Sequence, residues 1–414
     1  MDQFDGKDGG VDRRRSPPPS AAPSRTRSNV LLLVVVLPCM VVIARSYARL
    51  SIVPPSAGGE GCDWLLSKSH TSNRTVSHAM CVSHDAGLRG SSSALAREFA
   101  PPHYDDDDTL SFVVLGDFGR DGHCCQRDVA VEMARACSVL NCSFVLNTGD
   151  AFYGHGLLAE DEEQVRTSWR DVYLVHPELN ATEHGWLSML GNHEYRGSAE
   201  AVLRLAAADA RFVMPGRNYS KLLQSGVVRV LVIVLDTSPM IDAYRREGLA
   251  GDNRMVGQRD GVKTQWHNVP AQLAWLRATL AAHADVAIKL VAGHHPVYTS
   301  GAHYGEDDDF LRLHLAPLLE EYRVAAYFCG HDHNLQYHRP SSASAVHYFG
   351  SAAGSKVNNP MARVDDGLRF FAQVPGFMAV RATLQQVHVA IVDYAGAVLY
   401  AVDIAVPLVG AIVT

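Results

Sequence analysis

The sequence predicts an α/β domain over residues 110–405 on three observations. Apolar runs of strand length recur along this region, and the first is Leu110–Leu115. Between that run and the next, apolar residues recur at helical spacing, which predicts a β-α-β unit. Five of the apolar runs also end in a short polar cluster. In open α/β sheets ligands bind beyond the carboxyl ends of the strands, so these clusters mark the expected site.

The composition supports a large folded body. The chain has 414 residues, of which 47% are hydrophobic, so it can bury a sizeable core and is not disordered throughout. The formal net charge is −7, and no long Lys/Arg cluster follows Ser51. Nucleic acid is therefore not expected as a partner.

The first 48 residues differ in kind from the rest. Residues 1–29 are rich in Pro, Ser, Gly, Asp and Arg, which predicts a disordered basic cytoplasmic tail. Residues 30–48 carry a nearly unbroken apolar run, which we interpret as a signal anchor, with a cleaved signal peptide as the close alternative. Both interpretations predict a luminal or extracellular body. A retained anchor would make a single-pass type II membrane protein that contacts the membrane through this segment.

Four N-glycosylation patterns fit this route, although each also arises by chance. They begin at Asn73, Asn141, Asn180 and Asn218. Residues 49–109 show no clear periodicity and end in the acidic run Asp105–Asp108, which predicts a linker or stalk.

The cysteines are consistent with an oxidising compartment. Cys39 lies in the apolar segment, and the odd number that follows implies at least one unpaired thiol. Cys329 ends an apolar run, so we expect it to be buried and unreacted. Cys62 and Cys81 form a candidate local bridge. The pairing of the other four stays open: Cys124, Cys125, Cys137 and Cys142.

The first β-α-β unit places two carboxylates on neighbouring strand ends. Leu110–Leu115 leads into Gly-Asp117-Phe-Gly, a helix follows over 129–140, and Phe144–Leu146 leads to Gly-Asp150-Ala-Phe-Tyr153. Because adjacent strands end at the same edge, Asp117 and Asp150 can share a site.

The later elements repeat this arrangement. Strands are expected over 186–190, 228–235, 288–292 and 324–329, helices over 271–282 and 311–322, and further strands of a second sheet over 387–392 and 397–402. Three of these strands run into Gly-Asn192-His-Glu, Gly-His294-His-Pro and Gly-His331-Asp-His333. The polar insert 238–268 is expected to be a surface loop beside the site.

The clusters together predict a metal site. Each has a structural alternative, because Gly-Asp is a common turn, Asn192 could cap a helix, and a lone His is usually structural. Five such clusters at five strand ends argue against coincidence. Oxygen and imidazole donors suit iron, zinc or manganese, and they outnumber what one ion needs. Two ions bridged by a carboxylate form the clamp used for displacement at phosphorus.

The five blocks, in this order, resemble those of the purple acid phosphatases among the calcineurin-like metallophosphoesterases. The run Phe328–Tyr337 resembles the small tartrate-resistant type over its whole length, and the resemblance covers about residues 110–402. It implies a four-layer α/β/β/α sandwich, in which two mixed sheets are flanked by helices.

The resemblance also implies roles for individual residues. Fe(III) would be held by Asp117, Tyr153 and His333, a divalent ion (Fe, Zn or Mn) by Asn192, His294 and His331, and Asp150 would bridge them. His193 and His303 match histidines that contact phosphate and help to protonate the leaving group. His295 departs from the tartrate-resistant type, which tends to have Tyr there, and either adds a proton donor or fills the space.

The implied activity is acid hydrolysis of phosphate monoesters by a metal-bound hydroxide, with broad substrate tolerance. Two alternatives remain. One is a calcineurin-like phosphodiesterase or nucleotide pyrophosphatase with a colourless dinuclear centre. The other is a membrane-tethered, non-catalytic binding protein of the same fold. Tyr153 discriminates between the enzymes, because a phenolate on Fe(III) absorbs visible light.

Overall fold

The computed structural model describes residues 51–53, 92–100, 108–242, 244, 268–305, 309–364 and 367–407. The expected tail and signal anchor, Asn73, the Cys62 and Cys81 pair and most of the insert 238–268 lie outside these ranges. Within them, no helix has both the length and the apolar character needed to span a bilayer.

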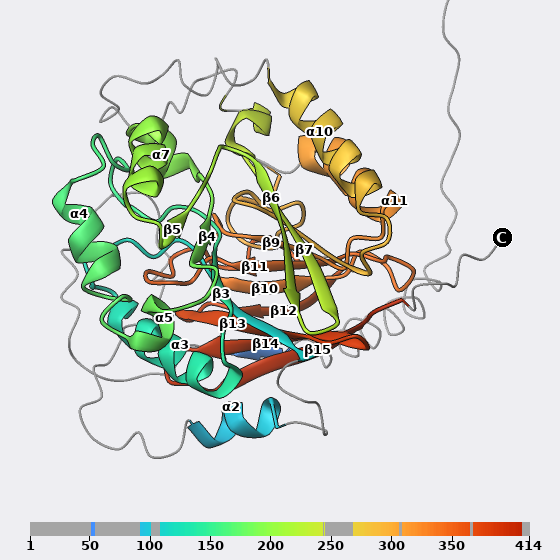
Figure 1. Ribbon diagram of the computed structural model, residues 1–414, viewed down its shortest axis with the longest axis horizontal. Coiled ribbons are helices and arrows are strands. Elements are labelled where there is room, and N and C mark those ends of the chain that lie inside the picture. The colour runs from blue at the N-terminus through green and yellow to red at the C-terminus, as the bar shows by residue number, and fades with distance from the viewer. Residues whose placement is uncertain are drawn as a thin grey trace, which may run out of the picture. The chain divides into compact units, whose positions relative to one another are not determined.

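Two mixed sheets form the centre of the domain (Figure 1). In the described part of the chain, the first sheet has the strand order β1 (Ser51–Val53), β12 (Leu368–Ala372), β10 (Leu335–His338), β11 (His347–Ser351), β9 (Ala326–Cys329), β8 (Ile288–Gly293), β7 (Val228–Leu235) and β6 (Tyr219–Ser225). The second has the order β15 (Val398–Ala405), β14 (Gln386–Asp393), β13 (Gly376–Ala382), β2 (Leu110–Leu115), β3 (Phe144–Asn147), β4 (Trp186–Ser188) and β5 (Phe212–Val213).

Helices connect these strands. They are α2 (Ser92–Glu98), α3 (Gln126–Leu140), α4 (Glu163–Val165), the π-helical turn η2 (Arg166–Arg170), α5 (Pro177–Asn180), α6 (Asn192–Arg196), α7 (Ala199–Ala208), the 3₁₀ turn η3 (Ser238–Met240), α10 (Val269–Ala282), the π-helical turn η4 (Leu311–Leu315) and α11 (Ala316–Glu321). The predicted helix over 311–322 is thus a π-helical turn that continues into α11.

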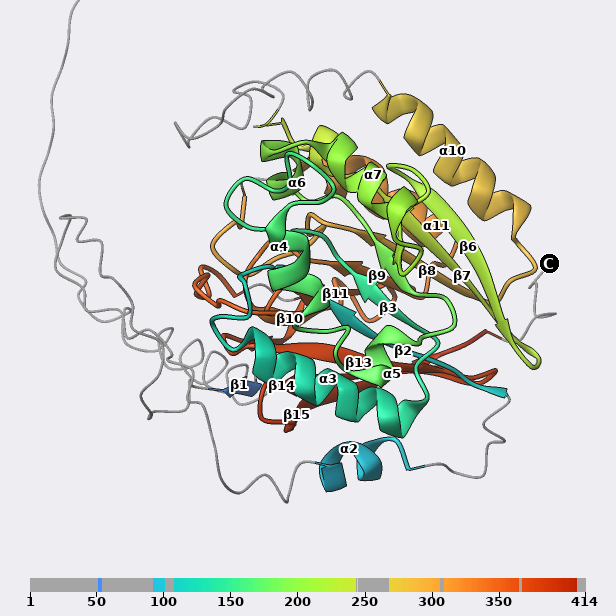
Figure 2. The same cartoon turned by 60° about the vertical axis from the view of Figure 1, so that its left-hand side comes forward.

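Apolar side chains hold four layers together. Between the sheets, the rings of Phe112 on β2 and Phe328 on β9 lie 6.2 Å apart, edge to face. On the outer face of the second sheet, α3 buries Val129 and Met133 (Figure 2). On the outer face of the first sheet, a second apolar cluster joins β7 and β8 to α10 and α11. Two mixed sheets flanked by helices are therefore the fold, as predicted.

Register brings the strand ends that precede the polar clusters together. In the second sheet β2 and β3 are parallel, with Leu115 opposite Asn147. In the first sheet β7, β8 and β9 are parallel, with Leu235 opposite Gly293. The sheets are joined near these ends, because Ser351 Oγ donates to the carbonyl oxygen of Val114 over 2.8 Å.

Two local features answer questions that the sequence left open. Cys137 and Cys142 form a disulfide across the end of α3. Cys125 is also disulfide-bonded. Cys329 is buried and its thiol donates to the carbonyl oxygen of Phe349, as expected for an unreacted cysteine.

Candidate metal centre

Three of the predicted ligand residues have a strained backbone. Asp117, Asp150 and His331 have φ angles of 59°, 51° and 73°, in the left-handed region that residues other than glycine rarely adopt. Strain of this kind persists where the surroundings over-determine it, and it gathers at functional sites. Here the strained residues also contact each other, because the backbone N–H of His331 donates to Asp117 Oδ2 over 2.9 Å.

Three side chains form a first group of donor atoms. The Tyr153 hydroxyl oxygen lies 2.9 Å from Asp117 Oδ1 and 2.8 Å from His333 Nε2. The carboxylate oxygen and the imidazole nitrogen are 3.4 Å apart. These three atoms therefore surround a common point, although they come from the loops after β2, β3 and β9.

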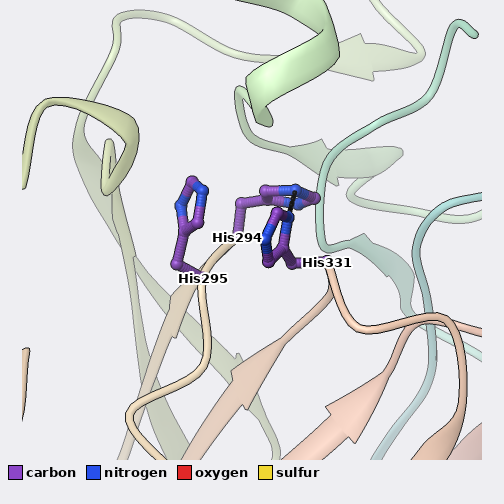
Figure 3. A group of neighbouring side chains, drawn as sticks. All are labelled: His294, His295 and His331. Carbon is purple, nitrogen blue, oxygen red and sulfur yellow. Dashed lines mark hydrogen bonds between the residues drawn. The ribbon is translucent and has the colours of Figure 1, made fainter. Parts of the chain in front are cut away.

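Three more side chains form a second group. Asn192 Oδ1 lies 3.0 Å from both His294 Nε2 and His331 Nδ1, and the two nitrogen atoms are 3.3 Å apart. Figure 3 shows the rings of His294 and His331 together, joined by a dashed line. Asp150 lies with both groups, because its Oδ2 is 3.5 Å from His294 Nε2 and it clusters with Asp117.

The spacing within each group fits a metal ion. Ligand atoms about 2.0–2.2 Å from an ion and roughly at right angles lie about 3 Å apart, which is close to the distances found here. Imidazole, carboxylate, amide and phenol donors suit first-row metals. The structure therefore brings all seven predicted ligand residues into one place, where His and Asp side chains could hold metal.

Second contacts fix the orientation of the ligand histidines. His294 Nδ1 lies 2.9 Å from the carbonyl oxygen of Thr148, and His333 Nδ1 lies 2.8 Å from Asn358 Oδ1. A metal-binding histidine commonly uses its other ring nitrogen in this way, and the contact sets which nitrogen faces the ion. In both rings Nε2 is therefore the nitrogen directed at the site.

The electrostatics of the protein without ions favour uncharged ligands. Burial raises the pKa of Asp117, and burial together with the charge of Asp117 raises the pKa of Asp150. Burial lowers the pKa of His331 well below its ordinary value and that of His333 to about 4. Two buried carboxylates that repel each other are costly unless a cation sits between them, so the site is suited to cations.

Glu194 ties two ligand loops together. Its carboxylate accepts hydrogen bonds from the backbone N–H groups of Asp150, Ala151, Phe152 and Gly191, over 2.7–3.3 Å. The first three amides belong to the loop that carries Asp150 and Tyr153, and Gly191 precedes Asn192. Burial raises the pKa of Glu194 to about 8, and the hydrogen bonds from Gly191 and Asp150 partly oppose that shift. One side chain thereby sets the distance between the two groups of donors.

The three predicted catalytic histidines occupy different surroundings. The His193 ring lies 4.4 Å from that of Tyr153, and its Nε2 accepts a hydrogen bond from Arg196 Nη1 over 3.1 Å. The His303 ring lies 4.3 Å from that of His331. Burial and the charge of Arg196 lower the pKa of His193 well below its ordinary value. His193 is therefore a neutral ring whose Nε2 already has a donor.

His295 is buried and held from two sides. Its Nδ1 lies 2.9 Å from Thr237 Oγ1, and its Nε2 lies 3.3 Å from the Tyr244 hydroxyl, at the start of the insert 238–268. Its ring stands beside the other two in Figure 3, 4.5 Å from that of His331. His295 therefore links the metal centre to this insert.

Sequence reasoning missed several residues of the site. Glu194 and Arg196 lie in or next to the Gly-Asn-His-Glu block, and Arg120 directly follows the Gly-Asp-Phe-Gly block. A charged residue within four positions of a predicted ligand is the available signal. The sequence does not give the partners of Glu194 and Arg120, because both contact residues far away in the chain.

Residues 110–335 match the calcineurin-like phosphoesterase family. Purple acid phosphatase 17 of Arabidopsis thaliana is 33% identical over 310 residues, which cover 71% of this chain and 84% of the relative. The human tartrate-resistant acid phosphatase type 5 is 28% identical over 307 residues, which cover 70% of this chain and 89% of the relative.

Solved structures share the fold. GAP50, described as the anchor in the inner membrane complex of Plasmodium, superposes with a TM-score of 0.60 at 18% identity and covers 72% of this chain and 89% of its own. A purple acid phosphatase from yellow lupin seeds superposes with a TM-score of 0.51 at 16% identity and covers 73% and 55%, respectively.

Proposed function

Because the chain belongs to the calcineurin-like phosphoesterase family and is a hydrolase of the purple acid phosphatase type, we propose that it hydrolyses phosphate monoesters with an Fe(III) ion and a divalent ion. The divalent ion would be iron, zinc or manganese. The arrangement of the seven donor residues in two groups, joined by Asp150, supports a pair of ions over a single one.

Each residue has a role in this proposal. Asp117, Tyr153 and His333 would hold Fe(III), and Asn192, His294 and His331 the divalent ion, with Asp150 shared. Bound ions would supply Lewis-acid activation of phosphate oxygens and of the attacking water. Glu194 would keep the two groups of ligands at a fixed separation. His331 and His333 would stay neutral through burial and so remain able to bind.

We assign proton delivery to the leaving group to His303, which is half-buried beside His331. His193 and His295 would position the phosphate and its surroundings. The reason is that His193 Nε2 is engaged by Arg196 and both ring nitrogens of His295 have partners. His303→Ala is expected to lower kcat more for esters of poor leaving groups than for aryl esters, because only the former need protonation.

The contact of Tyr153 with Asp117 and His333 is the observation that carries the assignment of iron. The oxidised holoenzyme is expected to be pink or purple, and Tyr153→Phe is expected to lose this colour while keeping its fold. The measurement is the visible spectrum together with metal analysis. Tyr219→Phe, a buried tyrosine remote in sequence, is the matched control. A colourless protein that contains iron would leave a phosphodiesterase or nucleotide pyrophosphatase as the better reading.

The donor set also bears on the non-catalytic alternative. A fold shared with an anchor protein does not decide between scaffold and enzyme, but a scaffold has no need of buried carboxylates that repel each other. Asp150→Asn is expected to remove phosphatase activity together with bound metal. Full activity in this variant would contradict the proposal.

We further propose a luminal or extracellular location for the catalytic domain. Asn141 and Asn180 are exposed, so the structure leaves both open to glycosylation, and the disulfide between Cys137 and Cys142 is typical of an oxidising compartment. Digestion with an N-glycosidase is expected to increase the electrophoretic mobility of protein made in a eukaryotic cell.

A further inference from the structure

We propose that Arg120 and Arg196 form an anion-binding subsite beside the metal centre, which takes a second anionic group of the substrate. The inference rests on the proposed function and narrows its substrate class to phosphate esters that carry two anionic groups.

Four side chains form a row along the edge of the metal centre. The guanidinium carbon of Arg120 lies 3.8 Å from the centre of the Tyr153 ring. The Tyr153 ring lies 4.4 Å from the ring of His193, and His193 Nε2 accepts from Arg196 Nη1 over 3.1 Å. One guanidinium group thus lies at each end of the row. Between them lie Tyr153, a predicted ligand, and His193, which follows the predicted ligand Asn192 in the chain.

Both guanidinium groups have hydrogen-bond donors that lack an acceptor among the described residues. Among the described residues, that of Arg120 makes no hydrogen bond to an oxygen atom, and that of Arg196 makes one contact, with His193. The Nε atom of each is buried and lacks an acceptor. By contrast, Arg211 places two donors on Asp209, over 2.7 and 2.8 Å. Because a buried donor without an acceptor is unfavourable, the pair is completed by an acceptor from outside the chain.

Neighbouring carboxylates do not fill this role. Asp121 accepts from Thr167 and Ser168, and Glu194 is taken up by backbone amides. Gln126 fixes the loop that carries Arg120. The backbone N–H of Arg120 donates to Gln126 Oε1 over 3.1 Å, and Gln126 Nε2 donates to the carbonyl oxygen of Ser168 over 2.7 Å. Arg120 is therefore held in its place, and among the described residues no carboxylate accepts a hydrogen bond from its guanidinium group.

A third cation adds to the positive charge. Lys356, on the loop after β11, has a lowered pKa because of burial and the charge of Arg120. The field of Arg120 therefore reaches Lys356, as an anion subsite next to a phosphate site requires.

The chemistry of guanidinium selects the ligand. Its planar fork of donors matches a phosphate or carboxylate group in a bidentate contact. The phosphate to be cleaved would occupy the ions, so the two arginines would receive another group of the same molecule. Diphosphates, bisphosphates and phosphorylated carboxylic acids carry such a group, whereas monoesters of simple alcohols do not.

The test compares a diphosphate that cannot be hydrolysed, methylenediphosphonate, with orthophosphate as ligands of the holoenzyme, by titration calorimetry. The wild-type protein is expected to bind diphosphate more tightly by about tenfold or more, the size expected for a charge-assisted hydrogen bond. Arg120→Gln and Arg196→Gln are each expected to reduce this ratio, and the double variant to bring it to within about twofold of unity. Arg204→Gln, an exposed arginine paired with Glu160 on the surface, is the matched control.

The contrary outcomes are distinct. A double variant that keeps the wild-type ratio would overturn the subsite. So would equal weakening of both anions with a shift of the visible band, since the arginines would then serve Tyr153 and His193 alone. Binding is measured without turnover, so an inactive protein that still prefers diphosphate would refute the proposed phosphatase activity and leave the subsite standing.

Discussion

At the scale of single residues, the candidate site combines two unfavourable features, buried carboxyl groups and a strained backbone. Asp117, Asp150 and His331 lie in the left-handed region, and the two carboxyls are buried against each other. Neither condition is favourable by itself, and both are repeated at adjacent strand ends. The surrounding contacts, and above all those of Glu194, hold these residues in place.

Replacing one acceptor oxygen of Glu194 tests whether its hydrogen bonds hold the two loops in place. Glu194→Gln replaces one acceptor oxygen with an NH₂ group that faces backbone donors, so the loops of Asp150 and Asn192 should loosen. We expect metal affinity to fall by about 10- to 100-fold, as for other outer contacts of metal sites. Competition with a chromogenic chelator measures it. Glu160→Gln, at the surface, is the control, and unchanged affinity in Glu194→Gln would show that the contacts do not position the ligands.

Asp236 provides a test by pH away from the ligands. It is buried after β7, and its Oδ2 accepts from the Tyr195 hydroxyl. Burial raises its pKa from 3.8 to about 6, although Tyr195 and Arg217 oppose the shift. Because the pKa is higher in the folded state, the contribution of this carboxyl to stability is fully present at pH values below its pKa in the unfolded state. It is lost as pH rises through its pKa in the folded state.

The free energy of unfolding of the wild type, relative to Asp236→Asn, should therefore fall by about 2 kcal/mol between pH 4 and pH 7. Urea unfolding at several pH values measures this difference. Asp161→Asn, at the exposed surface, is the matched control. If the difference between the wild type and Asp236→Asn rises with pH, the predicted sign is wrong.

At the scale of elements, α2 shows that the region before the first central strand contributes to the domain. Leu95 and Phe99 are 1% and 4% exposed within the main apolar cluster. Arg381 on β13 donates to the carbonyl oxygen of Phe99 over 2.7 Å, and the Phe99 ring lies 5.0 Å from that of His388. The helix therefore covers part of the second sheet, although it lies within the residues for which a linker is expected.

Leu95→Ala should lower the free energy of unfolding by about 2–3 kcal/mol, because it removes a fully buried side chain. The same change at Leu384, which is 48% exposed, should cost less than about 0.5 kcal/mol. Denaturant unfolding of the two variants gives the comparison. Equal effects would indicate that α2 does not pack against the sheet in solution.

At the scale of the whole molecule, the proposed metal centre draws its residues from both sheets. Asp117, Asp150, Tyr153 and Asn192 follow strands of the second sheet, and the three histidines proposed as ligands follow strands of the first. Ions bound among them would bridge the two halves of the core. Metal binding should therefore contribute to global stability and not only to activity.

Chelation of the holoenzyme should lower Tm by about 10 °C, the shift expected when a ligand present at about 1,000 times its Kd is removed from a domain of this size. Differential scanning calorimetry with and without chelator measures it, and adding back iron with zinc or manganese should restore the original Tm. An unchanged Tm, with metal shown to be lost, would contradict a bridging role.

Much of the fold and of the site could be predicted from the sequence because the signals are local. Apolar runs mark strands such as β2 and β8 whatever their neighbours are, and a polar cluster directly after each run marks a strand end. These signals therefore predict which residues gather at the site. They do not predict the pairing of Cys137 with Cys142, since several pairings fit the same spacing.

Contacts between segments far apart in the chain were decided only by the tertiary structure. The hydrogen bonds of Glu194 to the Asp150 loop and the packing of Arg120 on Tyr153 depend on how loops from different strands approach each other. The sequence by itself determined which donors are present and at which strand ends. The register and stacking of the two sheets decided which of these donors lie together and, among the described residues, which guanidinium groups lack a hydrogen-bonded carboxylate, because those distances span both sheets.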